Sequence, residues 1–392
     1  MNKTVLLMML ILLAIFPPLS TDMYLSGFIQ IALFLHTSQA GIQLSLTIFL
    51  FGYTFTQLIF GPISDYFGRK PVLLTGITIY IIGSIGCVFS ITASQFYLAR
   101  LVQAIGAGSG AVISLAVIKD RFEHKERLYY LGLISTIMGF APLVAPIIGG
   151  YIIKFYEWQY IFGILVACGL VSIFFALLME ETNKSLSESI FNKIFSNYIK
   201  MFLLKEFIYP TLAGGFAFAA MFVYISGSPS IFIDIFGVNV DKYGYYFAVN
   251  AIAIIMGNFL AMRISRIVSS YMIQLYFNIF LSMSSLVLVL VNIYFNSIYG
   301  IVIPMFFVSL SIGGILPTTT ANAIQRININ IGQASALITF IRFGSATLIT
   351  WIVSKLNFTD CLQFSCSILA CAVLALPLSF RTNTISLINS KD

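Results

Sequence analysis

The chain has 392 residues, of which 59% are hydrophobic and 9% are charged, and its formal net charge is +7. Ordinary soluble domains contain roughly 45–50% apolar and about 25% charged residues, so this composition excludes a soluble fold. The positive charges fall in short segments between long apolar runs, a pattern that membrane insertion explains without nucleic acid. The sequence therefore predicts an all-α integral membrane protein.

Twelve apolar runs are long enough to cross a bilayer, which takes about 20 helical residues. In chain order they lie near residues 5–27, 41–61, 71–91, 96–118, 129–153, 158–179, 207–235, 243–262, 271–293, 298–321, 333–354 and 359–380. The first follows Lys3 as a signal peptide would, but no small-residue cleavage site comes after it. We therefore expect an uncleaved first span.

A central polar stretch divides the spans into two sets of six. The predicted parts are one half at residues 1–179, a linker at 180–206 and a second half at 207–392. Apolar linker residues recur at helical spacing, namely Phe191, Ile194, Phe195, Tyr198, Ile199 and Phe202. This spacing fits an amphipathic helix on the membrane surface or a solvated linker helix without a role, and we favour the second.

Loop charges predict the orientation, because cytoplasmic loops retain lysine and arginine. Of the 21 basic residues, most lie in loops on the same side as the termini. Lys154, Lys242 and Lys355 fall on the opposite side. Both termini are therefore expected in the cytoplasm.

The loop after the second span reads GPISDYFGRKPVLL and resembles a motif of major facilitator proteins. Its characteristic positions are held by Gly61, Asp65, Gly68, Arg69 and Lys70. We expect Gly61 to permit a close helix approach, Gly68 to adopt a positive φ, and Asp65 to meet a helix N-terminus. Pairing of Arg69 with Asp120 would complete a latch that holds the two halves outward-facing. The simpler interpretation is that Arg69 and Lys70 only set the topology.

The fourth span, LARLVQAIGAGSGA, resembles a second motif of this family and contains Arg100 and Gln103. An arginine within a membrane costs about 2.5–3.5 kcal/mol on insertion scales, so Arg100 is a candidate functional residue. The alternative is that its side chain reaches the membrane surface from near the helix end.

The fifth span contains APLVAPIIGGYI, which resembles the antiporter motif of the same family. We expect Pro142 and Pro146 to kink the helix, and Gly149 and Gly150 to pack tightly against a partner. The family pattern has glycine where this chain has Ala145.

Three further segments, STDMYL, YISGSPSIF and IRFGSATL, resemble the Bcr/CflA branch of drug:proton antiporters. The resemblance implies the major facilitator fold with 12 spanning helices, a monomer, and a place in the bacterial inner membrane. It also implies efflux of small amphipathic compounds by alternating access, with the proton gradient as energy source and no cofactor. A proton-linked exporter or importer of metabolites or siderophores on the same fold is the alternative.

By the same resemblance, spans 1, 4, 7 and 10 line a central cavity. Its candidate residues are Gln103, Phe218, Met221, Phe222, Tyr224, Ser228, Asn250, Asn322 and Arg342. Helix packing is the simpler explanation for most of them taken singly. Arg342 lies near the bilayer midplane, where it would contact a substrate or a wet polar network, or else bridge backbone carbonyls.

Asp22 is the clear carboxylate within a span, and it lies at about the same depth as Arg100. A changing contact between the two would load and release a proton once per cycle, whereas a static pair or a helix cap would do neither. His36 and His124 both fall in loops, and neither a catalytic set, a metal site nor a nucleotide-binding loop is evident. We therefore expect a transporter for small molecules and protons, not an enzyme, with the bilayer as its partner.

Overall fold

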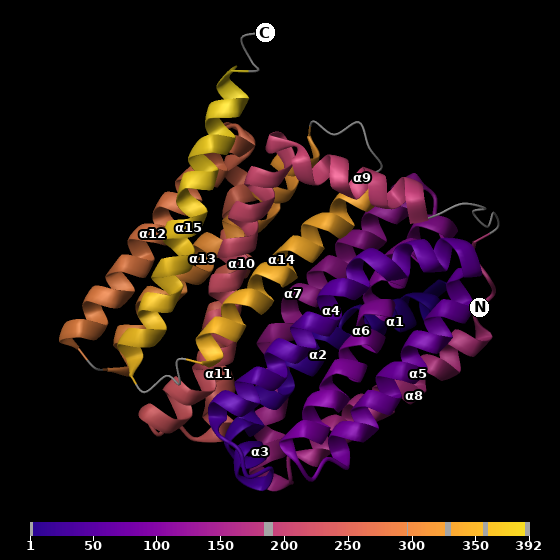
Figure 1. Ribbon diagram of the computed structural model, residues 1–392, viewed down its shortest axis with the longest axis horizontal. Helices are drawn as coiled ribbons and strands as arrows, with labels where there is room; N and C mark the ends of the chain where they lie inside the picture. Colours follow the sequence, from indigo (N-terminus) through magenta and orange to yellow (C-terminus); the bar gives the residue numbers. More distant parts are fainter. Residues whose placement is uncertain (1–2, 184–190, 296, 326–330, 356–359, 389–392) are drawn as a thin grey trace. The chain divides into compact units, whose positions relative to one another are not determined.

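The computed structural model describes residues 3–183, 191–295, 297–325, 331–355 and 360–388, and within these ranges the chain is helical without strands (Figure 1). Eleven described helices are long and apolar enough to cross a membrane, or twelve if the bent helix pair at the N-terminus forms one span. The predicted all-α membrane architecture is confirmed.

The first compact unit comprises Met1–Ile194 and Val240–Gly244. Its first span is divided into α1 (Lys3–Ala14), α2 (Phe16–Asp22), the 3₁₀ helix η1 (Met23–Gly27) and α3 (Phe28–Phe34). The other spans are α4 (Gln39–Phe67), α5 (Arg69–Val88), α6 (Ala93–Arg121), α7 (His124–Phe155) and α8 (Gln159–Leu178).

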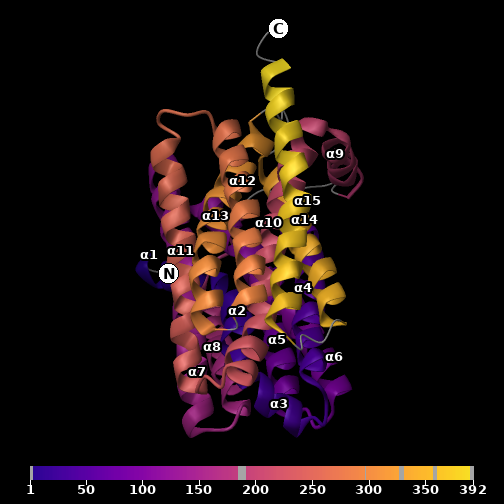
Figure 2. The ribbon, with the colours of Figure 1, turned by 90° about the vertical axis from the view of Figure 1, so that its left-hand side faces the viewer.

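The second compact unit comprises Phe195–Asn239 and Tyr245–Asp392. Its elements are α9 (Phe191–Leu203, most of it in this unit), α10 (Lys205–Pro229), the π-helical η2 (Ser230–Ile235), α11 (Val240–Ile264, of which Val240–Gly244 belong to the first unit), α12 (Ser270–Tyr294), α13 (Ile298–Ile324), α14 (Ile331–Ser354) and α15 (Cys361–Ile388). Within it α10 packs against α13, α14 and α15 (Figure 2). Of the predicted linker, residues 184–190 lie outside the described residues.

The first span is broken where its sequence cannot sustain a regular helix. Pro17 and Pro18 lie at the first positions of α2 and supply no backbone N–H, so the helix restarts after Ile15. The two parts of the span are bent by 41°. Further along the same part of the span, Asp22 ends α2 at its junction with η1, where the hydrogen bonding changes from the α-helical to the 3₁₀ pattern.

Helix α6 is the centre of the first unit, because its glycines let three neighbours approach closely. A Cβ added at Gly106 would overlap the backbone nitrogen of Tyr80 on α5. One added at Gly108 would overlap the hydroxyl of Thr56 on α4, and one at Gly110 would lie 3.2 Å from a backbone oxygen of α1. The small residues of the fourth-span motif thus bring α5, α4 and α1 against one helix.

We predict that Gly106→Ala lowers the melting temperature of the purified protein, because α5 must move away from α6; overpacking of this kind costs about 1–3 kcal/mol. The matched control is Gly163→Ala on α8, where an added Cβ meets nothing within 4 Å. Equal melting temperatures for the two variants would show that the α5–α6 contact does not constrain the fold.

Candidate functional site

Arg100 is a fully buried cation, and it has no acidic partner among the residues that the structure describes. Its Nη1 donates to the carbonyl oxygen of Ser20 at 2.9 Å and to Oε1 of Gln103 at 2.6 Å. Its Cζ lies 4.2 Å from the ring centre of Tyr24 and 4.5 Å from that of Phe49. The charge is therefore held by ring faces and neutral acceptors. The alternative that Arg100 reaches the membrane surface is wrong, since its whole side chain is enclosed.

The guanidinium of Arg100 also carries donors that the protein does not use. Nε and Nη2 are buried, and no acceptor in the described part of the chain meets hydrogen-bond geometry with either of them. A buried donor left without an acceptor typically costs about 1–3 kcal/mol, and more when the group is charged. This arrangement gives Arg100 a strong attraction for any anionic acceptor that comes within reach.

The contacts of Arg100 extend into a polar network that joins α2, α5 and α6. Gln103 donates from Nε2 to Ser84 at 2.9 Å, so both ends of its amide are bonded inside the first unit. The hydroxyls of Ser20 and Tyr80 are 2.9 Å apart, and the Tyr80 ring stacks on Phe16 at a centroid distance of 4.2 Å. Gln103, expected in the cavity, is thus bonded to its own unit.

Asp22 is buried close to this network but is not paired with Arg100. Its Oδ1 accepts a hydrogen bond from the hydroxyl of Thr21 at 2.8 Å. The structure shows no ion pair between Asp22 and Arg100, and Asp22 makes no side-chain cap bond at the start of η1. Neither static role considered for Asp22 is therefore seen in this conformation, in which a backbone carbonyl two residues earlier binds Arg100 instead.

The antiporter-like motif of α7 packs on η1, the 3₁₀ part of the first span. A Cβ at Gly149 would overlap the carbonyl oxygen of Met23, and Ser26 donates to the carbonyl oxygen of Pro146 at 3.0 Å. A Cβ at Gly150 would lie 2.7 Å from the backbone oxygen of Val240, in the Val240–Gly244 segment of the same unit. Helix α7 runs without interruption through Pro142 and Pro146. Gly149 thus lets α7 pack closely against the backbone of Met23, the residue that follows Asp22.

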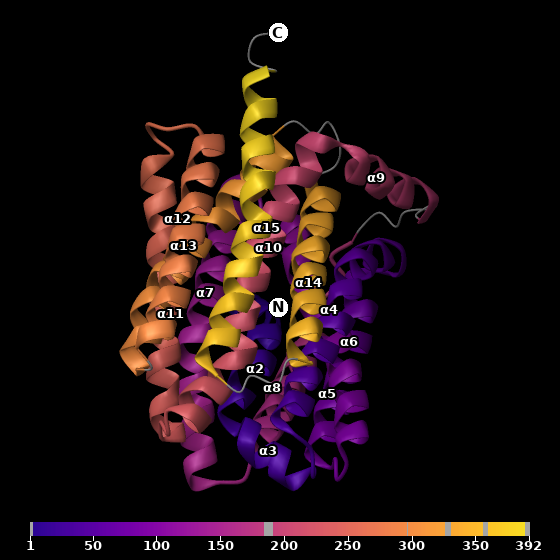
Figure 3. The same cartoon turned by 60° about the vertical axis from the view of Figure 1, so that its left-hand side comes forward.

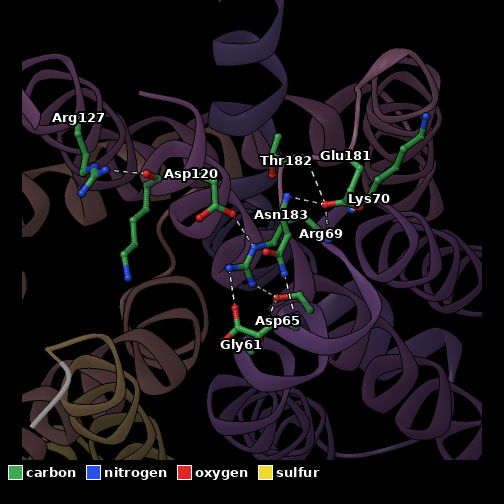
Figure 4. A network of polar contacts seen from close by, with 11 residues as sticks. Gly61, Asp65, Arg69, Lys70, Asp120, Arg127, Glu181, Thr182 and Asn183 are labelled. Carbon is green, nitrogen blue, oxygen red and sulfur yellow. Dashed lines mark hydrogen bonds and ion pairs between the residues drawn. The ribbon is translucent and has the colours of Figure 1, made fainter. Parts of the chain in front are cut away.

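The loop between α4 and α5 forms an ionic cluster (Figure 4). The guanidinium of Arg69 lies 2.6 Å from Oδ1 of Asp65 and 2.9 Å from Oδ2 of Asp120, and it also donates to Ser64 at 2.6 Å. The pair of Arg69 and Asp120 expected from the sequence is present. All four residues belong to the first unit.

Glu181 is a member of this cluster that sequence reasoning missed. Its carboxylate accepts hydrogen bonds from the backbone nitrogens of Arg69 at 2.9 Å and Lys70 at 3.0 Å, the first residues of α5. The anion at a helix N-terminus is therefore Glu181, whereas Asp65, to which we assigned that role, pairs with Arg69. Gly68 has a φ of 94°, and a Cβ there would lie 2.6 Å from Glu181. The available signal was an acidic pair placed directly after the sixth span.

The electrostatics of Glu181 follow from these contacts. Partial burial by itself raises the pKa of this carboxyl group. Backbone N–H groups of Asn183, Lys70, Arg69 and Thr182 stabilise the ionised form and hold the pKa below its ordinary value. Asn183 also donates to the backbone oxygen of Asp65 at 3.0 Å, so the segment after α8 is tied to both sides of the loop.

The expected role of Gly61 is wrong in this structure. A Cβ at this position would have Val112 as its sole neighbour, at 3.9 Å, which is ordinary contact. The close approach on α4 occurs instead at Gly52, where a Cβ would lie 3.3 Å from the backbone oxygen of Leu101.

Two polar clusters in the second unit include predicted cavity residues. Asn250 donates to the hydroxyl of Tyr224 at 2.7 Å and accepts from Ser309 at 3.0 Å, which joins α10, α11 and α13. Asn322 on α13 donates to Gln274 on α12 at 2.6 Å. For these residues the structure shows the helix-packing contacts that were the simpler interpretation.

Arg342 on α14 is bonded to α13. Its Nη2 donates to the carbonyl oxygen of Leu316 at 2.6 Å and to the hydroxyls of Thr319 and Thr320 at 2.9 and 2.8 Å. Gly214 on α10 leaves room for it, because an added Cβ would lie 3.4 Å from Nη2. Nη2 therefore bridges to a backbone carbonyl, which was one of the roles expected for Arg342. The side chain as a whole is only half-buried.

Aromatic side chains from α10 and α14 gather beside Arg342. The ring of Phe218 lies 5.0 Å from that of Phe222 and 4.9 Å from that of Phe343, between centroids. Met221 on the same helix is half-buried, and Ser228 is buried with its hydroxyl 3.2 Å from the carbonyl oxygen of Ile225. This part of the unit combines rings, a flexible thioether and one cation.

The family model of the Major Facilitator Superfamily matches residues 4–350. This chain belongs to that superfamily. Its family is one of transporters rather than enzymes, which confirms the function class expected from the sequence.

Relatives include the bicyclomycin resistance protein homolog of Haemophilus influenzae, 28% identical over 93% of this chain and 92% of that protein. YdgK of Bacillus subtilis, an uncharacterized MFS-type transporter, is 34% identical over 83% of each chain. The multidrug resistance protein MdtL of Escherichia coli is 27% identical over 60% of each.

Two solved structures share the architecture. A D-xylose-proton symporter matches 96% of this chain and 97% of its own with a TM-score of 0.77 at 13% identity. The xylose transporter XylE from E. coli, in a partially occluded inward-open conformation, matches 96% of each chain with a TM-score of 0.73 at 11% identity. At these identities the likeness establishes the major facilitator fold, as predicted.

The Glu181 contacts predict a pH-dependent stability. Because its pKa is lowered by folding, its contribution is complete above the ordinary glutamate pKa of about 4.3 and is lost as the pH falls through the lowered value. Glu181→Gln should therefore lower the melting temperature at neutral pH, with the difference from the unmodified protein closing in acid. A charge at a helix N-terminus is typically worth roughly 0.3–1 kcal/mol.

The matched control is Glu180→Gln, since Glu180 lies 3.5 Å from Arg121 and both side chains are exposed, a contact of little energetic weight. It should leave the melting curve unchanged at every pH. If Glu181→Gln behaves like this control, the carboxylate does not stabilise the loop.

Proposed function

We propose that this protein exports small amphipathic compounds in exchange for protons, by alternating access, from a bacterial inner membrane with both termini in the cytoplasm. Relatives whose names refer to bicyclomycin or multidrug resistance support the cargo class. Proton exchange is supported by the antiporter-like motif of α7 and by the buried carboxylate beside it. In this proposal the monomer needs no cofactor, because the proton gradient supplies the energy.

The observation that carries the proposal is the separation of Asp22 and Arg100. Asp22 is bonded to Thr21, while Arg100 binds the carbonyl of Ser20 and keeps two donors unused. A protonated Asp22 is compatible with this arrangement because a neutral carboxyl needs no cation. When the proton leaves, the carboxylate becomes an acceptor for the unused donors of Arg100, and the broken helix that carries both Ser20 and Asp22 must move to make that contact.

On the second unit, we assign the cargo surface to Phe218, Met221 and Phe222, with Arg342 beside them. Aromatic and thioether groups adapt to cargo of different shapes, as multidrug export requires. The remaining donors of Arg342 would then contact polar or anionic groups of the cargo.

Asp22→Asn imitates the protonated carboxyl group, so it should abolish efflux driven by a pH gradient while leaving cargo binding intact. Transport is measured as uptake into inverted vesicles with an imposed gradient, and binding as a ligand-dependent thermal shift of the purified protein. The control is Asp234→Asn, an exposed acid on η2, which should transport normally. Uphill transport by Asp22→Asn with unchanged pH dependence would exclude Asp22 as the coupling group.

The cluster around Arg69 is proposed to latch the transporter in its outward-facing state. Asp65→Asn should cripple transport without reducing membrane insertion. Arg69→Lys keeps the positive charge that topology requires, but a single ammonium cannot hold two carboxylates in the same geometry, so it should also lose transport. Normal transport by well-expressed Arg69→Lys protein would contradict the latch and indicate that Arg69 serves only to set the topology.

A further inference from the structure

One flank of α9 is docked on the second unit. Met201 and Tyr198 are buried, and Asn197 donates to Gln333 on α14 at 3.0 Å. Helix α9 lies across the direction of α10 and α14 (Figure 3), and Leu204 alone separates it from α10. Because α10 is a spanning helix, the end of α9 is held at the edge of the bilayer.

The next flank of the same helix is apolar and uncovered. Ile199 is 49% exposed, Phe202 54% and Leu203 75%. At about 100° per residue these three follow Tyr198 around the helix, and exposed Ser196 and Lys200 come after them. Around its circumference α9 therefore presents a buried apolar flank, an exposed apolar flank and a polar flank in that order. If all the free sides of α9 were in water, its exposed apolar flank would be solvated at a cost in free energy.

We propose that α9 is an interfacial helix, which inserts its exposed apolar flank among the acyl chains of one leaflet and holds acidic phospholipid headgroups with Lys200 and Lys205. Both lysines are exposed, and neither forms an ion pair among the described residues. Basic side chains beside an apolar stripe are the composition that binds anionic membrane surfaces. The chain also passes from the exposed Leu203 through the exposed Leu204 directly into the first turn of the spanning α10. The solvated-linker interpretation that we favoured from the sequence is therefore replaced.

The placement can be tested by attaching nitroxide spin labels to single cysteines in the full-length protein, reconstituted in vesicles of phosphatidylethanolamine and phosphatidylglycerol. Cys366 is exposed and Cys168 half-buried, so both are changed to serine, and the buried Cys87, Cys361 and Cys371 stay unlabelled. Labels at Ile199 and Leu203 should collide more often with oxygen, which partitions into the membrane, than with a water-soluble nickel chelate. A label at Ser196 should show the reverse.

Two outcomes would overturn the proposal. If labels at Ile199 and Leu203 are as accessible to the nickel chelate as the label at Ser196, α9 does not enter the bilayer. The headgroup contact is tested separately with Lys200→Gln plus Lys205→Gln, which should reduce the oxygen preference at Ile199 in the acidic vesicles and leave it unchanged in phosphatidylcholine vesicles. An equal effect in both vesicles, or none in either, would contradict recognition of acidic headgroups.

Discussion

The first unit is organised around the problem of keeping the positive charge of Arg100 in a dry interior. A buried ion without a counter-ion is costly, and here rings of Tyr24 and Phe49 together with neutral oxygens reduce that cost. The oxygen of Ser20 is supplied by α2, which passes into the 3₁₀ helix η1 two residues later, after Asp22. The burial of Arg100 thus ties together the packing around the cation, the backbone of the first span and the unused donors that an anion could bind.

The second unit holds a comparable cation by different means. Arg342 uses the hydroxyls of Thr319 and Thr320 and a backbone oxygen of α13, with space left by Gly214. Neither Arg342 nor Arg100 forms an ion pair within the described residues. Hydroxyl and carbonyl oxygens are weaker partners than carboxylates, so both guanidinium groups can exchange partners at smaller cost than a salt-bridged arginine.

Hydropathy and motif spacing predicted the spans, the positive φ of Gly68 and the pair of Arg69 with Asp120, because each depends on local sequence or on a shared membrane depth. The sequence could not identify Glu181, whose partners are backbone N–H groups more than a hundred positions earlier. From the sequence, Asp22 and Arg100 share a depth in the membrane, but the structure shows no contact between them, since depth says nothing about rotation around each helix. Close packing at Gly52 rather than Gly61 depends on the same unknown rotation.

The central claim is that Asp22 changes its protonation state and that Arg100 responds to the change. Infrared difference spectra of the full-length protein in vesicles, recorded between acid and alkaline pH, report directly on carboxyl groups and on guanidinium contacts. The account predicts a carboxylic-acid band that disappears at alkaline pH together with a change in the arginine bands, both missing from Asp22→Asn. Identical difference spectra for the two proteins would contradict it.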